Sequence, residues 1–547
     1  METRTGNASE LPPAAQDPKR GTAEQAAALA ASDPTQFGRQ LYARHCAACH
    51  GERGDGLGIA AAYLFPKPRD LRVGRFRLVS TSNNVPSGAD LHGVLLRGMP
   101  GSIMPPWAHL AQNERDALVS EVMRLRREGA QEQYIAVMKE QEGLTDEQIA
   151  AEDVQAGIRE YVESIAVPGD STQVPEFSPS TAEALARGKE VYAKSGCLQC
   201  HGSEGKGDGV QKMVDEEKLP TAPRDFTLGI FKGGHDPASL YRRIAYGMPG
   251  TPMPSSSQLS AEQMMDLVHY IRSMSTEDQR QAAVLNRAKI GAVRVAALPD
   301  SPRAAAWSAA PVVRLRMTPL WWRNHADPDL HVQSVHDGRR IAIRLSWNDA
   351  VEDGHAISSQ SFEDAVAMQL YRGDSEPFLG MGGSNAPVDV WFWDADRQSP
   401  TDVEDQYPNV VADIYPFSEQ SVATAEYRRE GTRRSAQPEV SLPALASGNQ
   451  IVPGRAPTGG SDLAVGGPGS VTFRMPQSQL VDIRGQWEEG RWTVVMSRTL
   501  MVTSEQDRVS LEPGSRASVA FAIWDGSRQD RDGKKLITIW QDLELQE

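Results

Sequence analysis

The placement of the cysteines constrains this chain more than any other feature of its sequence. There are four cysteines, and all of them lie in two pentads of the form Cys-x-x-Cys-His, at residues 46–50 and 197–201. No cysteine remains to form a structural disulfide. Because both pentads combine the same residue types at the same spacing, we interpret each as a site of cysteine and histidine chemistry.

Cys-x-x-Cys-His is the pattern of covalent c-type haem attachment. The two thiols add to the vinyl groups, and the histidine that follows places its imidazole on one face of the iron. We therefore expect two haem c groups, with these ligands: Cys46, Cys49 and His50 for one, and Cys197, Cys200 and His201 for the other. A structural zinc ion would need further ligands at each pentad, and no spare cysteine is available to supply them.

The two pentads belong to two copies of one repeated unit. In each copy a helix-like run precedes the pentad, and Gly-Asp-Gly, Pro-Arg-Asp and Gly-Met-Pro-Gly-x-x-Met-Pro segments follow it. These segments lie at 37–44 and 184–194, 54–56 and 207–209, 68–70 and 223–225, and 98–105 and 247–254. Each unit closes with an amphipathic helix, and Ser260 and Gln263 predict a capping box at the start of the second one. The chain therefore contains a tandem duplication.

The sixth iron ligand has to come from elsewhere in each unit, and the repeated Met-Pro segments are the natural source. A thioether sulfur is a soft ligand that raises the reduction potential of haem iron. Each segment offers two methionines, which are Met99 or Met104 in the first copy and Met248 or Met253 in the second. Histidine is the alternative ligand, and the candidates are His92, His109, His235 and His269.

Composition changes along the chain and predicts a multidomain fold. We expect a flexible tail at 1–30, two all-α units at 31–126 and 181–276, a helical spacer and linker at 127–180, a second linker at 277–304, and an all-β, sandwich-like domain at 305–547. The predicted strands include 312–317, 341–347, 365–371, 388–393, 492–498, 519–524 and 536–540. Asp337 and Gly338 predict a hairpin turn, and a stretch near 430–468 reads as a long surface insertion.

Over residues 35–126 and 181–276 the two units resemble class I cytochrome c domains. In that family the methionine ligand lies a short loop ahead of the C-terminal helix. The resemblance therefore selects Met104 and Met253 as the sixth ligands.

The same resemblance suggests roles for the Pro-Arg-Asp segments. Pro68 and Pro223 match the proline whose carbonyl accepts a hydrogen bond from the haem histidine. Arg69 and Arg224 would either meet a haem propionate or remain solvated loop charges.

The cysteine-free domain resembles a second family. The segments that carry this resemblance are 362–370, 377–382, 387–393, 490–495, 521–526 and 533–540. They are similar to the haem b-binding γ subunit of ethylbenzene dehydrogenase and its relatives, among them dimethylsulfide dehydrogenase, selenate reductase, chlorate reductase and nitrite oxidoreductase. In that family a non-covalent haem b has methionine and lysine ligands, which match Met381 and Lys535, with Lys534 as a rival. A buried lysine can lose its proton and bind iron, whereas the alternative is a core methionine beside a solvated lysine turn.

The resemblance implies an electron-transfer subunit without a substrate site of its own. Its partners would be the iron–sulfur β and molybdopterin α subunits of an oxidoreductase, of nitrite or nitrate type, and a soluble or membrane cytochrome. No acid–base pair, nucleophile or nucleotide loop in the sequence suggests catalysis. Two alternatives are a dihaem cytochrome that carries a haemless ligand- or partner-binding module, and a free-standing electron carrier.

Charge and hydropathy limit the surroundings of the chain. The net charge of -15 and the pI of about 5.3 argue against nucleic acid as a partner. No apolar run is long enough to predict a membrane span. Haem c attachment predicts a periplasmic location, yet residues 1–31 contain no apolar segment typical of an export signal. A trimmed or misassigned start, or export together with a partner, would account for this.

Overall fold

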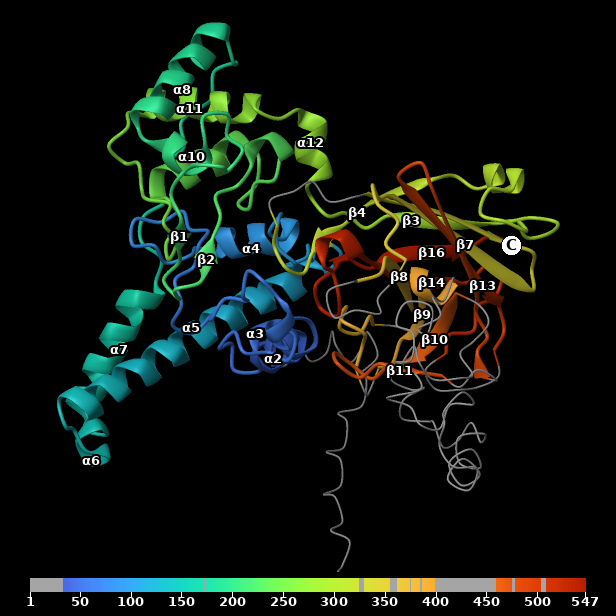
Figure 1. Cartoon of the computed structure of the whole chain (residues 1–547). Coiled ribbons are helices and arrows are strands. Elements are labelled where there is room, and N and C mark those ends of the chain that lie inside the picture. The colour runs from blue at the N-terminus through green and yellow to red at the C-terminus, as the bar shows by residue number, and fades with distance from the viewer. Residues whose placement is uncertain are drawn as a thin grey trace, which may run out of the picture.

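The computed structural model of the chain describes residues 33–171, 173–323, 329–354, 362–373, 375–383, 386–398, 459–474, 478–502 and 508–547. These residues form two helical units and one large sheet domain (Figure 1). The expected multidomain layout is confirmed. The predicted tail at 1–30 and residues 430–458 of the predicted insertion lie outside the described residues.

The first unit is built around two crossing helices. Its elements are α2 (Pro34–His45), α3 (Ala47–His50), η1 (Ala61–Tyr63), α4 (Gly88–Arg97) and the first half of α5 (Gln112–Gln141). Asp33 caps α2 by accepting a hydrogen bond from the amide of Gln36 at 2.9 Å. Helix α2 crosses α5 closely because Gly38 has no side chain, and a Cβ there would lie 2.8 Å from the carbonyl oxygen of Ala117. The apolar faces of α2 and α5 enclose the core of this unit.

Helix α5 does not end with the first unit. It continues past residue 126, so the predicted spacer begins inside a helix. After the short α6 (Asp146–Ile149), α7 (Glu152–Ala166) folds back along the second half of α5. The rings of Tyr134 and Tyr161 stack with their centroids 4.0 Å apart. The resulting helical hairpin projects away from the sheet domain (Figure 1).

The second unit repeats the arrangement of the first. Its elements are α8 (Ala182–Lys194), α9 (Cys197–His201), η2 (Phe226–Leu228), α10 (Pro237–Tyr246) and α11 (Ala261–Ser273), and α12 (Glu277–Ala282) follows. The predicted capping box of Ser260 and Gln263 is present at the start of α11. The all-α prediction is wrong in one detail, because β1 (Met213–Val214) and β2 (Pro220–Thr221) form an antiparallel hairpin. Strands this short leave no alternating pattern in a sequence.

The C-terminal part of the chain, called the β domain, forms a single continuous sheet. Its described elements are β3 (Lys289–Arg294), η3 (Ala305–Ala309), β4 (Val313–Arg316), β5 (Thr318–Pro319), β6 (Asp329–His336), β7 (Arg340–Asn348), β8 (Ala365–Tyr371), β9 (Asp389–Asp394), α13 (Ala395–Gln398), β10 (Gly460–Ala464), β11 (Thr472–Phe473), β12 (Asp482–Glu488), β13 (Arg491–Thr499), β14 (Arg516–Trp524), η6 (Gly526–Arg528), β15 (Leu536–Ile537) and β16 (Gln541–Leu545). The main path of the sheet is β11-β10-β9-β8-β14-β16-β3-β6-β7-β13-β12. Along this path only the pairs β16–β3 and β3–β6 are parallel among the described strands.

The sandwich-like shape that the sequence predicts arises from one curled sheet. Its two ends approach each other, and a Cβ on Gly485 of β12 would lie 2.2 Å from the ring of Trp393 in β9. Two elements contradict the predicted boundaries: β3 comes from the predicted linker at 277–304, and β10 lies within the predicted insertion near 430–468. Both strands contain residues that are depleted in strands, namely Gly291 in β3 and Gly460 and Asp462 in β10, which made them hard to recognise from the sequence.

The predicted strands of the β domain are otherwise found, with one break. The hairpin at Asp337 is confirmed, since its amide donates to the carbonyl of Arg340 at 3.1 Å. The last predicted strand, 536–540, is interrupted after Ile537. Partners Ala522↔Ile537 and Val519↔Gln541 leave one extra residue opposite β14, which is the geometry of a β-bulge.

The first unit is attached to the β domain through main-chain hydrogen bonds. The amide of Phe65 donates to the carbonyl of Leu320 at 2.9 Å, and the carbonyl of Phe65 accepts from the amide of Trp322 at 2.7 Å. The rings of Phe65 and Trp321 stack with centroids 5.4 Å apart. These contacts place the first unit directly against the sheet.

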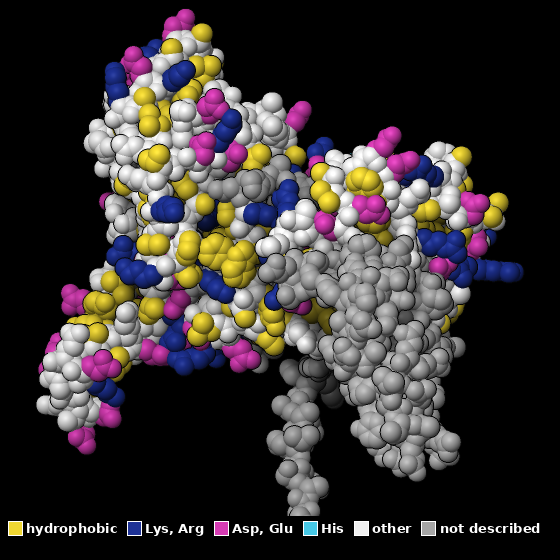
Figure 2. Space-filling model, in the orientation of Figure 1, with side chains coloured by type: hydrophobic (Ala, Val, Ile, Leu, Met, Phe, Trp, Pro, Cys, Tyr) yellow, Lys and Arg dark blue, Asp and Glu magenta, His cyan; other side chains and the backbone are white. Residues whose placement is uncertain are grey.

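On the face drawn in Figure 2, basic and acidic side chains are interspersed over the helical units. In the described part of the chain, no helix has both the length and the apolar composition needed to span a bilayer.

Candidate haem sites

The first pentad lies where one helix ends and the next begins. Cys46 occupies the junction of α2 and α3. The hydroxyl of Tyr42 donates to the carbonyl of Gly51, directly after the pentad, at 2.9 Å. The second unit repeats this bond with Tyr192 and Gly202 at 2.8 Å. The tyrosine shortly before each pentad therefore fixes the position of the pentad relative to the preceding helix.

Each pentad histidine is oriented by a backbone carbonyl. The Nδ1 atom of His50 lies 2.9 Å from the carbonyl oxygen of Arg69, and that of His201 lies 3.2 Å from the carbonyl oxygen of Arg224. Because a carbonyl only accepts, Nδ1 carries the proton and Nε2 keeps its lone pair for a metal. Burial lowers the pKa of both imidazoles, which favours the neutral form that binds iron. The ring of His201 also stacks on Phe226, with centroids 4.4 Å apart.

The carbonyl that accepts this hydrogen bond is one residue later than the resemblance implies. The carbonyl groups of Pro68 and Pro223 face Gly56 and Gly207 instead. A Cβ on these glycines would lie 2.9 Å and 2.6 Å from the respective proline oxygen. Because successive carbonyl groups of an extended chain point in different directions, the next carbonyl is the one that reaches the histidine. The role expected for Pro68 and Pro223 is therefore wrong.

The two Gly-Asp-Gly segments are not structurally equivalent, because the last glycine of the first segment, Gly56, corresponds to the first glycine of the second, Gly207. The amides of Gly56 and Gly207 both donate to the carbonyl of the pentad histidine, at 2.8 Å and 2.9 Å. Gly58 and Gly209 both lie against the pentad, where a Cβ would be 2.3 Å and 2.2 Å from a carbonyl oxygen. The feature that the two units share is a series of alternating glycines: Gly54, Gly56 and Gly58 in one, and Gly205, Gly207 and Gly209 in the other.

The two methionine segments form the same loop in both units. The amide of Met99 donates to the carbonyl of Met104 at 3.0 Å, and the amide of Met248 donates to that of Met253 at 3.1 Å. In the first unit, Met104 packs against the apolar cluster that also contacts Cys46. Met99 is not part of that cluster. This loop therefore directs Met104 toward the core that contains the attachment cysteine.

The alternative histidines lie in other environments. Their contacts are His92 with Asp116 at 2.8 Å, His235 with Glu277 at 3.9 Å, and ring pairs of His269 with Phe177 at 5.9 Å and of His109 with Trp107 at 5.7 Å. Ion-pair and packing contacts of this kind are ordinary for histidine in a folded protein. His109 also lines the cavity described next.

A cavity of about 1270 Å³ lies between the β domain and the first unit. It is larger than the roughly 300–1,000 Å³ of ordinary small-molecule sites. Met381 and Lys535 line it on the side of the β domain, and Cys49, Leu64 and Trp107 line it on the side of the first unit. The cavity therefore connects the predicted haem b ligands with one attachment cysteine of the first pentad.

Met381 has a backbone conformation that few side chains adopt. Its φ is +67°, in the left-handed region, which costs about 1–3 kcal/mol for a residue other than glycine. The turn is held by the amide of Gly382, which donates to the carbonyl of Phe378 at 3.0 Å. Strained residues of this kind cluster at ligand sites, and Met381 lies on the wall of the cavity.

The two neighbouring lysines differ sharply in their surroundings. The ammonium of Lys535 lies 4.5 Å from the centroid of the Trp524 ring and makes no hydrogen bond or ion pair with a described residue. Burial lowers the pKa of Lys535 to about 8. The ammonium of Lys534 instead donates to the carbonyls of Arg528 and Gln529, at 2.7 Å and 3.2 Å, and it does not line the cavity. Trp524 is a neighbour that the sequence alone did not suggest.

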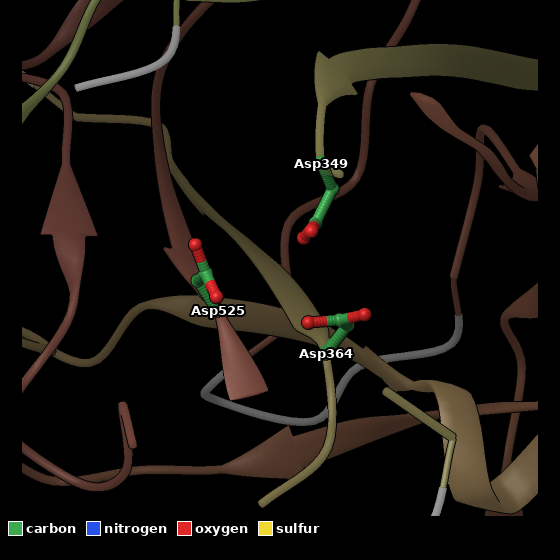
Figure 3. Close-up of side chains that lie close together, drawn as sticks. All are labelled: Asp349, Asp364 and Asp525. Atoms are coloured by element: carbon green, nitrogen blue, oxygen red, sulfur yellow. The ribbon is translucent and has the colours of Figure 1, made fainter. Parts of the chain in front are cut away.

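A separate group of acidic side chains, also absent from the sequence predictions, lies inside the β domain. Asp349 follows β7, Asp364 precedes β8 and Asp525 follows β14, and their carboxylates lie within 4.8 Å of one another (Figure 3). Burial raises the pKa of Asp349 and Asp364, and the neighbouring carboxylates raise that of Asp349 further. The indole of Trp492 donates to Asp364 at 2.9 Å. No local motif reveals such a group, because its members lie far apart in the sequence.

Family models match most of the described chain. The model described as Ethylbenzene dehydrogenase matches residues 304–536, and the model described as Cytochrome c matches residues 185–275. A third, described as Cytochrome C oxidase, cbb3-type, subunit III, matches residues 33–120.

Three curated relatives each align with 44% of the chain. A Haloferax mediterranei protein described as a respiratory nitrate reductase heme subunit, ORF7, is 28% identical over 248 residues, which cover 67% of its length. The dimethylsulfide dehydrogenase subunit gamma of Rhodovulum sulfidophilum is 25% identical over 257 residues, 73% of its length. The chlorate reductase subunit gamma of Ideonella dechloratans is 24% identical over 251 residues, 78% of its length. The β domain is therefore similar to the ethylbenzene dehydrogenase family, and it is joined here to two units similar to cytochrome c in a haem-containing electron-transfer protein.

Proposed function

We propose that this chain is the three-haem electron-transfer subunit of an oxidoreductase complex and has no substrate site of its own. Cys46, Cys49 and Cys197, Cys200 would attach two haem c groups, with His50, Met104 and His201, Met253 as the axial ligands. Met381 and Lys535 would be the axial ligands of one non-covalent haem b. Haem groups in these sites would supply one-electron redox chemistry, and the protein would supply their ligands and burial.

The observation that carries this proposal is the cavity shared by the β domain and the first unit. Met381, Lys535 and Cys49 line the same space, although they lie in different parts of the sequence. Lys535 is suited to bind a metal there, because burial lowers its pKa and no acidic group among the described residues forms an ion pair with it. The haem sites then follow one another in the order β domain, first unit and second unit.

The relatives suggest what lies at the two ends of this series. Two of them are named as gamma subunits, of dimethylsulfide dehydrogenase and of chlorate reductase, and a third as a haem subunit of nitrate reductase. By analogy, the β domain would contact an iron–sulfur β subunit, which itself binds a molybdopterin α subunit. The chemistry of the α subunit would be of nitrite or nitrate type. The second unit would exchange electrons with a soluble or membrane cytochrome. The setting would be extracytoplasmic, as is typical of cytochrome c domains.

A haem count tests the cofactors directly. A pyridine haemochrome spectrum would be recorded on haem-replete protein before and after extraction with acidified acetone. We expect two c-type haems to remain with the protein and one b-type haem to be extracted. Two c-type haems with nothing extractable would refute the third haem and support the alternative, in which the β domain is a haemless binding module.

Co-purification from the native source tests the partners. We expect the chain to be isolated together with molybdenum and an iron–sulfur protein. A chain that is isolated alone, with its full haem content, would instead be a free-standing electron carrier.

A further inference from the structure

Basic side chains gather where the two cytochrome units meet, and we call this group the junction cluster. It consists of Arg69 and Arg77 from the first unit and Arg224 and Lys232 from the second. Burial lowers the pKa of Lys232 well below its ordinary value, and repulsion by the three guanidinium groups of the cluster lowers it further. The cluster therefore draws on both units.

Two members of the junction cluster have acidic partners. Arg77 donates to Asp215 at 2.8 Å, and both side chains are nearly inaccessible to solvent. Arg69 donates to Glu216 and Glu217 at 2.9 Å and 3.0 Å. The three acids belong to the β1–β2 hairpin and its turn, so these ion pairs also hold the two units together.

The other two members have no acidic partner among the described residues. One guanidinium nitrogen of Arg224 donates to the carbonyl of Gly101 at 2.9 Å, and the group stacks on Trp322 with 3.6 Å to the ring centroid. Its other terminal nitrogen, Nη1, is buried without a hydrogen-bond partner. Lys232 makes no hydrogen bond or ion pair with any described residue. The buried Nη1 of Arg224, left without a partner, is costly, so this arrangement is suited to an anion.

The junction cluster lies beside the expected iron ligands of both units. The carbonyl of Arg224 orients His201, while its side chain reaches Gly101 in the loop that ends at Met104. Arg69 makes the corresponding contacts from the first unit: its carbonyl orients His50, and its side chain donates a hydrogen bond to Glu216 of the second unit. The amide of Glu216 in turn donates to the carbonyl of residue 250, in the loop that ends at Met253, at 3.1 Å.

We propose that Arg77, Arg224 and Lys232 form a carboxylate-binding site, shared by the two cytochrome units, that takes propionate groups of the c haems. This inference rests on the proposed attachment of haem at the two pentads. A haem held by His201 or His50 would place its own propionate carboxylate at the cluster. This carboxylate neutralises the unpaired cations and joins the units across their contact. The cations in turn favour the reduced haem, because oxidation adds a positive charge beside them.

Midpoint potentials of the two c haems test the site in the full-length, haem-replete chain. Arg224→Gln and Lys232→Gln each remove one cation of the cluster, and Lys232→Arg restores the charge. Lys189→Gln is the matched control, because Lys189 is exposed on α8 and loses the same charge far from the cluster. Each variant would be titrated by spectroelectrochemistry in chloride buffer with and without inorganic phosphate, after its covalent haem content is counted.

We expect both glutamine variants to lower at least one c-haem potential by more than Lys189→Gln does, with Lys232→Arg close to the unmodified chain. Potentials that match the control in both glutamine variants, with two c haems retained, would refute the shared site and leave haem attachment intact. Failure of the unmodified chain to attach two haems would refute the proposed function instead. Wild-type potentials that depend on phosphate, with the dependence lost in the variants, would show a free-anion site and refute the propionate assignment.

Discussion

At the scale of single residues, the two candidate axial ligands of the β domain are distinguished by their environment rather than by their sequence. Lys534 and Lys535 are adjacent, yet only Lys535 of this pair lines the cavity and lacks a polar partner among the described residues. Met381 is held at positive φ on the same cavity wall. Both properties belong to the folded chain and would not exist in an isolated peptide.

The first prediction compares the two lysines. Lys535→Leu should abolish the extractable b-type haem, because leucine fills part of the same space but offers iron no ligand atom. Lys534→Leu should retain it, since the Lys534 ammonium only bonds to carbonyls of Arg528 and Gln529. The measurement is the haemochrome count before and after extraction. Equal haem b content in the two variants would exclude Lys535 as a ligand.

The second prediction concerns the methionine loop of the first unit. Met104→Leu should remove the charge-transfer absorption of sulfur-ligated iron from one c haem. It should also lower its potential by on the order of 0.1 V or more, within the roughly 0.8 V range that axial ligands set. Met99→Leu should do neither, because Met99 lies outside the cluster that contacts Cys46. A loss of sulfur ligation in Met99→Leu alone would reverse the assignment.

At the scale of structural elements, strand ends of the β domain bring three carboxylates together inside the sheet. Asp349 is 6% exposed and Asp364 is 0% exposed, so water does little to screen their repulsion. Because their folded-state pKa values are raised, the folded chain binds these protons more tightly than the unfolded chain does. The free energy of unfolding therefore falls as the pH rises above the ordinary carboxyl pKa of about 4.

The third prediction follows from this repulsion. Asp349→Asn should stabilise the β domain by roughly 1–3 kcal/mol near neutral pH, because the native carboxyl must take up a proton on folding at a pH where it is ionised in the unfolded chain, and the amide removes that cost. Near pH 4 the effect should largely vanish, since the carboxyl of the unfolded chain is then largely protonated as well. Denaturant unfolding at both pH values measures the difference. A stabilisation that does not change with pH would mean that charge repulsion is not its cause.

At the scale of the whole molecule, the first unit is the middle of the series of haem sites. It contacts the β domain through the backbone of Phe65 and the second unit through Arg69 and Arg77. These contacts suggest that the three parts act as one electron-transfer body. The cavity then lies at one junction and the junction cluster at the other.

The fourth prediction tests the junction at the cavity. Trp321→Ala removes the ring that stacks on Phe65, and we expect slower equilibration of electrons within one chain while the haem content stays unchanged. Tyr161→Ala is the control, because it removes a comparable ring stack from the α5–α7 hairpin, outside the haem sites. Pulse radiolysis at several protein concentrations isolates the intramolecular rate. Equal rates in both variants would argue against coupling through this contact.

The sequence alone determined the parts of this protein whose chemistry is local. Two Cys-x-x-Cys-His pentads, their duplicated surroundings and most strands of the β domain could be recognised, because each depends on residues close together in the chain. The family resemblances supplied candidate ligands, yet even there the predicted proline carbonyls were wrong, since the carbonyl of the next residue is the one that reaches each histidine. Only the tertiary structure could decide what depends on distant contacts. It places Cys49, Met381 and Lys535 on one cavity, inserts β3 into the sheet and assembles the junction cluster. Burial and neighbouring charge, which set metal affinity and pKa, exist only after the chain has folded.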